Sequence, residues 1–157
     1  MKLSFDSTKL LKLTATSSAG LFSGAALYIN AADHPSRMTL DVVSCRQHWM
    51  QAYLRAKTFQ GAFCAVGSLS GAAVFFLEPE AENRILWLLG SGIFILVFPW
   101  TLLVMGSDIK KNLKEDVIET AGETWVISHI NKWNKQHMAR TFFGMAAFKL
   151  FLLALAN

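Results

Sequence analysis

Cysteine is scarce in this sequence, and so are the patterns that build metal or disulfide scaffolds. Its 2 cysteines are Cys45 and Cys64, and no Cys-x-x-Cys motif occurs. Disulfide frameworks and zinc knuckles need more cysteines at short, regular spacings, so both classes are excluded. The formal net charge is +4, yet lysine and arginine form no dense tract. Binding to nucleic acid is therefore not expected either.

Charge is absent from two long stretches of the chain. Thr58–Leu77 and Ile85–Met105 contain no aspartate, glutamate, lysine or arginine. A helix of about 20 apolar residues crosses the hydrocarbon core of a bilayer, and each stretch reaches that length. Hydrophobic residues make up 53% of the sequence and mean hydropathy is +0.34, which is more apolar than an ordinary soluble domain. The composition predicts an integral membrane protein that crosses the bilayer several times.

Glycines spaced four residues apart favour helices that pack closely in lipid. Gly20 and Gly24 lie in an apolar stretch near the N-terminus, and Gly67 and Gly71 repeat the spacing in the first uncharged stretch. A cleaved signal peptide has no use for such residues, so the N-terminal stretch is predicted to be a retained helix. With a further apolar stretch at the C-terminus, the sequence predicts one domain over residues 1–157 with helices at about 10–32, 57–77, 85–105 and 133–156.

Prolines and charged segments divide the predicted helices. Pro35 follows His34, and proline breaks a helix and restricts the residue before it, so the first helix is expected to end near His34. Pro99 is expected to kink the third helix. Residues 36–56 are predicted to form an interfacial segment, and residues 106–136 a connection with a short surface helix. The expected fold class is an all-α membrane protein, a bundle of four transmembrane helices with interfacial helical segments in its two longer loops.

Four crossings fix which segments share a side of the membrane. Both termini and the turn at residues 78–84 lie on one side, and the two longer loops lie on the other. The longer loops carry most of the lysines and arginines. Because cytoplasmic loops are enriched in these residues, the longer loops are predicted to be cytoplasmic. The localisation expected is an integral, multi-pass membrane protein.

The same parity brings two histidines to one membrane face. His34 closes the first predicted helix and His137 opens the fourth. Polar groups at membrane depth are unfavourable unless they are paired or face a cavity, so a pocket at this face is expected. The other polar and aromatic residues of this half are Asn30, Trp49, Tyr53, Thr101, Trp133 and Arg140.

Four short motifs carry a resemblance to a known family. They are Ala19–Tyr28, His34-Pro35, Phe98-Pro99-Trp100-Thr101, and Trp133 followed by His137-Met138-Ala139-Arg140. In this order they resemble the anthrone oxygenase-like membrane family, from about Thr14 to Leu155. The resemblance implies a compact four-helix membrane domain. It also implies oxidation of anthrones to anthraquinones by molecular oxygen without a recognised cofactor, with His34 and His137 at the family's histidine positions. Gly106-Ser107-Asp108-Ile109 departs from the Pro-Thr-Asn type of sequence expected after the third helix.

The chemistry of such an oxygenase assigns a role to each candidate residue. A base must remove an acidic proton to give an anion that reduces oxygen directly, and neutral histidine suits this task. His34 and His137 are therefore the predicted bases, and Arg140 is the cation predicted to stabilise the oxyanion. His137 and Arg140 share a helix face because they are three residues apart. The residues predicted to bind a hydrophobic phenolic or anthrone-like substrate are Asn30, Trp49, Tyr53, Thr101 and Trp133; no cofactor and no metal are expected.

Simpler interpretations remain open for these residues. The tryptophans and the tyrosine would also suit an interfacial aromatic belt, and Arg140 would suit a lipid phosphate. The histidines at helix ends would also serve as caps. Asp33, His34 and His137 offer a two-histidine, one-carboxylate metal site, although neither an HxxxH nor an ExxH spacing supports it.

A non-enzymatic role is the alternative for the whole protein. A membrane subunit or assembly factor would use the same small-residue helix faces to pack against a partner. The expected partners are the lipid bilayer and a hydrophobic aromatic small molecule for the enzyme, or a membrane protein or second copy for the alternative. A channel or carrier is less favoured because charged residues do not run through the helices.

Overall fold

The computed structural model describes residues 7–157, and this range consists of helices joined by short turns, with no strand. The all-α prediction is therefore confirmed. The elements are α1 (Ser7–Tyr28), η1 (Ile29–Asp33), α2 (His34–Arg37), α3 (Val42–Leu77), α4 (Ala81–Ile95), α5 (Val97–Trp100), η2 (Thr101–Met105), α6 (Gly106–Asn112), α7 (Val117–Ala121) and α8 (Glu123–Ala156). η1 and η2 are single π-helical turns.

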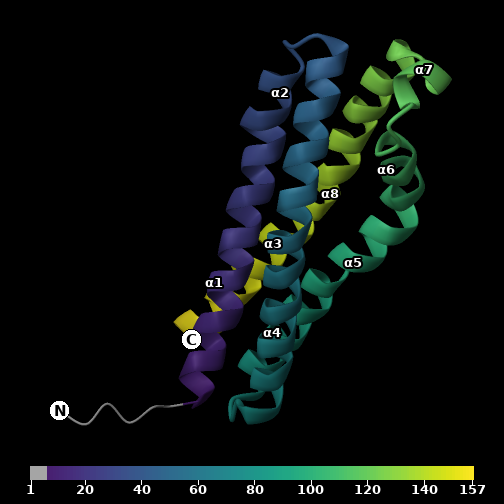
Figure 1. The fold of residues 1–157 in the computed structure, drawn as a ribbon. Coiled ribbons are helices and arrows are strands. Elements are labelled where there is room, and N and C mark those ends of the chain that lie inside the picture. The colour runs from purple at the N-terminus through teal and green to yellow at the C-terminus, as the bar shows by residue number, and fades with distance from the viewer. Residues whose placement is uncertain (1–6) are drawn as a thin grey trace.

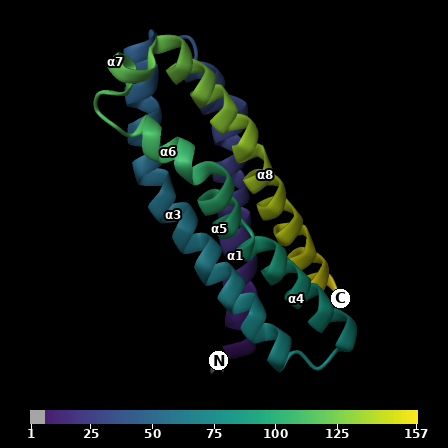
Figure 2. The ribbon, with the colours of Figure 1, turned by 90° about the vertical axis from the view of Figure 1, so that its right-hand side faces the viewer.

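α1, α3, α4 and α8 pack in a ring, in which each helix lies mainly against two of the others (Figure 1 and Figure 2). The start of α1, the α3–α4 turn and the C-terminus lie at one end of the bundle, and α2 and α7 lie at the other. At the first end, Lys12 pairs with Glu78 at 2.5 Å, and Asn157 donates to Asn83 at 3.2 Å. This arrangement agrees with the predicted parity, while the compartment of each end stays a prediction.

Within the described residues, three helical stretches are long and apolar enough to cross a membrane. They are Val42–Leu77, Ala81–Asn112 and Glu123–Ala156. The chain is therefore described as a membrane protein on the length and composition of these helices. A fourth crossing would have to be made by α1, so the count of four crossings stays a prediction.

Two helices begin earlier than the sequence predicted. α3 starts at Val42 rather than near residue 57, and α8 starts at Glu123 rather than near residue 133. Asp41 caps α3 by accepting a hydrogen bond from the Ser44 backbone N–H at 3.0 Å, and no proline or glycine follows before Gly61. The polar segment 42–56 is therefore the first part of α3 rather than a separate interfacial element. The prediction mistook a boundary in charge for a boundary of the helix.

The first helix ends less than one turn beyond His34, close to the predicted place, but Pro35 is not what stops it. The helical conformation continues from α1 through η1 into α2, and this continuous helical run ends at Arg37. His34 N–H bonds to the carbonyl of Ile29, five residues back, which is the wider π pattern. Pro35 then stands in the first turn of α2, where a residue without a backbone N–H is tolerated. The π turn thus lets the helix pass a proline.

Pro99 interrupts the third predicted helix as expected. α4 ends at Ile95 and α5 begins at Val97. Ile95 is the residue four before Pro99, whose ring clashes with that carbonyl and whose nitrogen cannot donate to it. The chain then passes through η2 into α6, so this side of the bundle is made of short pieces (Figure 1).

Two apolar clusters fill the bundle, and a layer of polar residues separates them. The first contains Phe22, Cys64, Phe94 and Phe151 among others, and the second is built around Trp49, Met105, Ile130 and Trp133. On α3 the second cluster ends by residue 53 and the first begins at residue 63, whereas on α8 the second ends at Trp133 and the first begins at residue 143. The intervening residues carry the candidate site.

Candidate functional site

The polar layer is made by η1, α3 and α8. It contains Asn30 from η1, Gln60 from α3, and His137, Arg140 and Thr141 from α8. Gln60, His137, Arg140 and Thr141 are all buried, and His137 has no exposed surface. Burial of this many polar groups requires hydrogen bonds or ligands for each of them.

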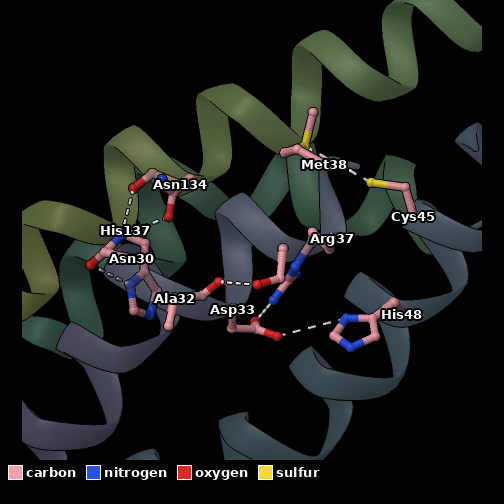
Figure 3. A network of polar contacts seen from close by, with 10 residues as sticks. Asn30, Ala32, Asp33, Arg37, Met38, Cys45, His48, Asn134 and His137 are labelled. Carbon is pink, nitrogen blue, oxygen red and sulfur yellow. Dashed lines mark hydrogen bonds and ion pairs between the residues drawn. The ribbon is translucent and has the colours of Figure 1, made fainter. Parts of the chain in front are cut away.

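Asn30 is the centre of a hydrogen-bond network with α8 (Figure 3). Its Nδ2 donates to the backbone oxygen of Asn134 at 3.1 Å and to the Asn134 Oδ1 at 2.7 Å. The backbone oxygen can only accept, so the orientation of the Asn30 amide is fixed. Its Oδ1 therefore faces His137 and Thr141, whose hydroxyl donates to it at 2.6 Å.

This network fixes the tautomer of His137. His137 Nδ1 lies 3.3 Å from the Asn30 Oδ1, which can only accept a hydrogen bond. The proton of a neutral imidazole is therefore assigned to Nδ1, and Nε2 carries the lone pair. Nε2 is buried and has no hydrogen-bond partner among the described residues. The arrangement is that of a base with a free, oriented acceptor.

Arg140 is a buried cation without a carboxylate partner among the described residues. Its Nη2 donates to the Gln60 Oε1 at 2.7 Å, and its guanidinium carbon lies 5.8 Å from the centroid of the Phe22 ring. Only 6% of the residue is exposed, so the alternative that Arg140 contacts a lipid phosphate is wrong. A buried guanidinium with one amide for a partner is an incomplete site.

The predicted aromatic residues form a connected group beside His137. Trp49 stacks on Tyr53 at 5.4 Å between centroids and meets Trp133 edge-on at 5.8 Å. Trp133 in turn lies 4.9 Å from the His137 ring. Trp49 and Trp133 are 1% and 4% exposed, so they face the interior and the belt interpretation is wrong for them. Tyr53 is half-buried at the surface of α3.

A small recess lies between these aromatic residues and Arg140. Its free volume of about 10 Å³ is about that of one water molecule. We call it the Arg140 cavity, and it is lined by Ile29, Arg37, Ala52, Tyr53, Ala56, Lys57, Gln60, Trp133, His137 and Arg140. The exposed Lys57 and half-buried Tyr53 place its mouth on the outer face of α3.

His34 and Thr101 lie outside the Arg140 cavity. His34 Nε2 contacts the Asn131 Oδ1 at 3.2 Å, and Asn131 is six residues before His137 on α8. Burial lowers the pKa of His34 below 6.5, and its hydrogen bond to Asn131 opposes this only in part. The Thr101 hydroxyl donates to the Val97 carbonyl at 2.7 Å, beside the Pro99 break. His34 therefore faces α8 about 9 Å further along the helix than His137.

Asp33 serves an ion pair rather than a metal site. Its carboxylate pairs with Arg37 and lies 3.8 Å from the His48 Nδ1, as Figure 3 shows. Within residues 7–157 no group of three or more histidine, cysteine, aspartate or glutamate side chains is placed to hold a metal ion. The interpretation of Asp33, His34 and His137 as one ligand set is therefore not supported.

Three polar residues of the cavity lining, Gln60, Arg37 and Lys57, were not predicted from the sequence. Gln60 could have been found, because it is the one amide in the uncharged stretch Thr58–Leu77. Arg37 and Lys57 gave no such signal, since both looked like ordinary loop cations. Arg37 is in fact 2% exposed and lies 5.9 Å from the centroid of the Trp133 ring.

Comparison with known proteins places the chain in a family. The family model described as anthrone oxygenase matches residues 49–150. This range includes Trp49, Tyr53, His137 and Arg140, whereas Asn30 precedes it. No curated protein and no solved structure matches the chain significantly. Because the match covers well over half of the sequence, the chain belongs to the anthrone oxygenase family.

Proposed function

We propose that this protein is a membrane oxygenase that oxidises an anthrone-like or other phenolic substrate with molecular oxygen, using His137 as the base. The observation that carries the proposal is the oriented imidazole of His137. Its Nδ1 faces Asn30 and its Nε2 is buried and unpartnered beside Arg140. The family supports the class of substrate.

His137, Asn30 and Arg140 each have a task in this reaction. Nε2 of His137 takes a proton from the acidic carbon or oxygen of the substrate, and the Nδ1–H bond to Asn30 holds the resulting imidazolium. The substrate is left as an anion whose negative charge lies mainly on its oxygen. Arg140 lines the same cavity as His137, so its guanidinium can stabilise this negative charge. The anion is electron-rich enough to reduce oxygen directly. In total, one anthrone and one oxygen molecule give one anthraquinone and one water.

The size of the cavity sets a requirement on the substrate. A free volume of about 10 Å³ accepts one oxygen atom of a ligand but not a ring. The rings must therefore lie at the mouth, and Tyr53 and Lys57 must move to admit them. Ala52 and Ala56 line the same mouth one helical turn apart and leave it free of bulky side chains.

Oxygen uptake by the purified protein tests this proposal. The full chain in neutral detergent is given an anthrone or a hydroquinone, and oxygen consumption is followed with an electrode. We expect uptake by the wild type and a loss of about a hundredfold in His137→Ala, the size of a general-base contribution. His48→Ala is the matched control, because His48 is half-exposed on its ring and lies outside the cavity. Equal uptake by wild type and His137→Ala would reject His137 as the base.

A non-enzymatic subunit is the second candidate, and one observation favours it. An open apolar groove of about 640 Å³ runs between α1 and α8, with Gly24 and Phe142 among its lining residues. Within residues 7–157, a methyl group built on Gly24 would meet nothing within 4 Å, so this glycine makes no close packing contact inside the bundle. Absence of oxygen uptake together with a stoichiometric membrane partner after purification would favour this role over the enzyme.

A further inference from the structure

The Arg140 cavity has an excess of positive charge and of hydrogen-bond donors. Three of its lining residues are cationic, Arg37, Lys57 and Arg140, and no carboxylate is among the described residues that line it. Asp33 pairs with Arg37 from outside the lining, whereas Arg140 takes part in no ion pair within residues 7–157. Among the described residues, Arg140 has one hydrogen-bond acceptor, the side-chain oxygen of Gln60.

Several buried donors around the cavity lack acceptors. Among the described residues there is no hydrogen-bond partner for Arg140 Nε, Gln60 Nε2, Trp133 Nε1, or for Nε and Nη1 of Arg37. These four residues are between 2% and 6% exposed. Buried polar groups are satisfied in most proteins, so these five unpartnered donor atoms, which lie beside the unpartnered Nε2 of His137, point to a ligand that accepts several hydrogen bonds. An acceptor that also carries negative charge would complete the pairing of Arg140.

The position of the cavity along α3 makes it reachable by an amphipathic ligand. Residues 58–77 carry no charge, and 20 residues at 1.5 Å each extend about 30 Å, the thickness of the hydrocarbon core. Lys57 therefore lies at the hydrocarbon boundary, and Gln60 lies about one helical turn deeper. A ligand with an apolar ring in the lipid and a charged oxygen directed at Gln60 matches this placement.

We propose that the Arg140 cavity is a receptor for the single anionic oxygen of a phenolate or enolate, which it binds in the resting protein before oxygen is present. Arg140 and Gln60 hold the oxygen, Arg37 and Trp133 supply further donors, and Lys57 attracts the anion at the mouth. A ligand that is already ionised in water binds as the anion and leaves its proton in the solvent, whereas an anthrone that enters neutral becomes the anion when His137 takes its proton. Binding itself involves no redox step. The class of ligand rests on the proposed oxygenase function, whereas the charge of the ligand rests on the cavity itself.

Binding of a nitrophenol without oxygen tests the proposal. The phenolate form of 4-nitrophenol absorbs visible light and the neutral phenol does not, so absorbance reports which form is bound. The full chain in a neutral detergent is titrated under nitrogen at a pH where the free probe is mostly phenol. We expect the wild type to bind the probe as the phenolate. Arg140→Gln should weaken this binding at least tenfold, Gln60→Leu should weaken it less, and Arg140→Lys should retain part of it.

Arg55→Gln is the matched control, because Arg55 is an exposed arginine on α3 whose one hydrogen bond among the described residues is to the Gln51 carbonyl at 3.4 Å. Its affinity for the probe should equal that of the wild type. Size-exclusion profiles establish that each variant is folded, and if Arg140→Gln is not, Gln60→Leu and Arg37→Gln decide by the same criterion. Binding of the neutral phenol, or equal affinity in wild type and the folded cavity variants, would overturn the anion receptor.

The two proposals fail separately in these experiments. A protein that binds the phenolate through Arg140 but consumes no oxygen with any anthrone keeps the receptor and loses the oxygenase. A protein that consumes oxygen through His137 but binds the probe equally well without Arg140 keeps the oxygenase and loses the receptor.

Discussion

Two glycines of the bundle give a prediction that depends on packing alone. A Cβ atom on Gly144 would lie 2.6 Å from Cδ1 and 2.9 Å from Cε1 of Phe22, and 3.0 Å from Oγ of Ser23. Phe22 is fully buried and meets Phe94 edge-on at 5.2 Å between centroids, so a shift of its ring would disturb other core contacts. A Cβ on Gly24 would meet no atom of the described part of the chain within 4 Å. The two Gly→Ala substitutions therefore differ in their surroundings while both lie in helix interiors.

The expected free energies follow from two opposing effects. Replacing glycine by alanine inside a helix favours the folded state by about 1 kcal/mol in both variants. Overpacking against Phe22 costs about 1–3 kcal/mol in Gly144→Ala alone. Gly24→Ala should therefore be slightly more stable than the wild type, and the two variants should differ by about 1–3 kcal/mol. For a chain of this length, that corresponds to a difference in Tm of roughly 2–12 °C.

Thermal denaturation in detergent, followed by circular dichroism, measures this difference. Phe22→Leu in the Gly144→Ala background should recover part of the loss, because the smaller side chain leaves space for the added methyl group. A Tm of Gly144→Ala equal to that of Gly24→Ala would refute the packing of α1 against α8 described above.

Three further predictions concern the polar residues. Asn30→Ala should lower oxygen uptake by about ten- to a hundredfold because His137 loses the acceptor that fixes its tautomer. An oxygen electrode compares this variant with Asn83→Ala, a control whose side chain bonds the C-terminal Asn157, and equal uptake by the two variants would contradict the prediction. The free energy of unfolding should decrease as the pH falls below 6.5, since the pKa of buried His34 is lowered and the unfolded chain takes up a proton first. The drop in Tm between pH 7.5 and 5.5 should be smaller in His34→Gln than in the wild type, and an equal drop would show that His34 is not its cause. Lys12→Met should lower the free energy of unfolding by about 3–5 kcal/mol because it leaves the buried Glu78 carboxylate unpaired. Adding Glu78→Gln should restore the Tm, and an unchanged Tm in Lys12→Met alone would show that the ion pair does not stabilise the fold.

The sequence predicted the helical class correctly, while the roles of the site residues stay predictions. His137 and Arg140 line the same cavity, as their spacing of three residues on a helix suggested. Trp49, Tyr53 and Trp133 also form one group, although the sequence could not decide between lipid and interior for them. Periodicity fixes which residues share a face of one helix. It does not fix which face is turned toward the core.

The errors at helix ends have a common physical cause. Hydropathy identifies the part of a helix that suits lipid, whereas the helix itself ends where capping or proline stops the hydrogen-bond ladder. α3 begins at the Asp41 cap, well before its apolar part, and α1 passes Pro35 through a π turn that no residue pattern announces. Gln60 was missed for a different reason, since a lone amide in an apolar stretch gains meaning only when its partner, Arg140, is located.

The length of α3 has a consequence for how molecules would travel to and from the protein. Its 36 residues form a rod of about 54 Å, nearly twice the depth of the oily layer that it enters. The mouth of the cavity beside Lys57 thus lies at the interface between the hydrocarbon core and the aqueous phase. A hydrophobic substrate would enter laterally from the bilayer, and a more polar product would leave to the aqueous phase. The same opening would therefore serve for entry and release.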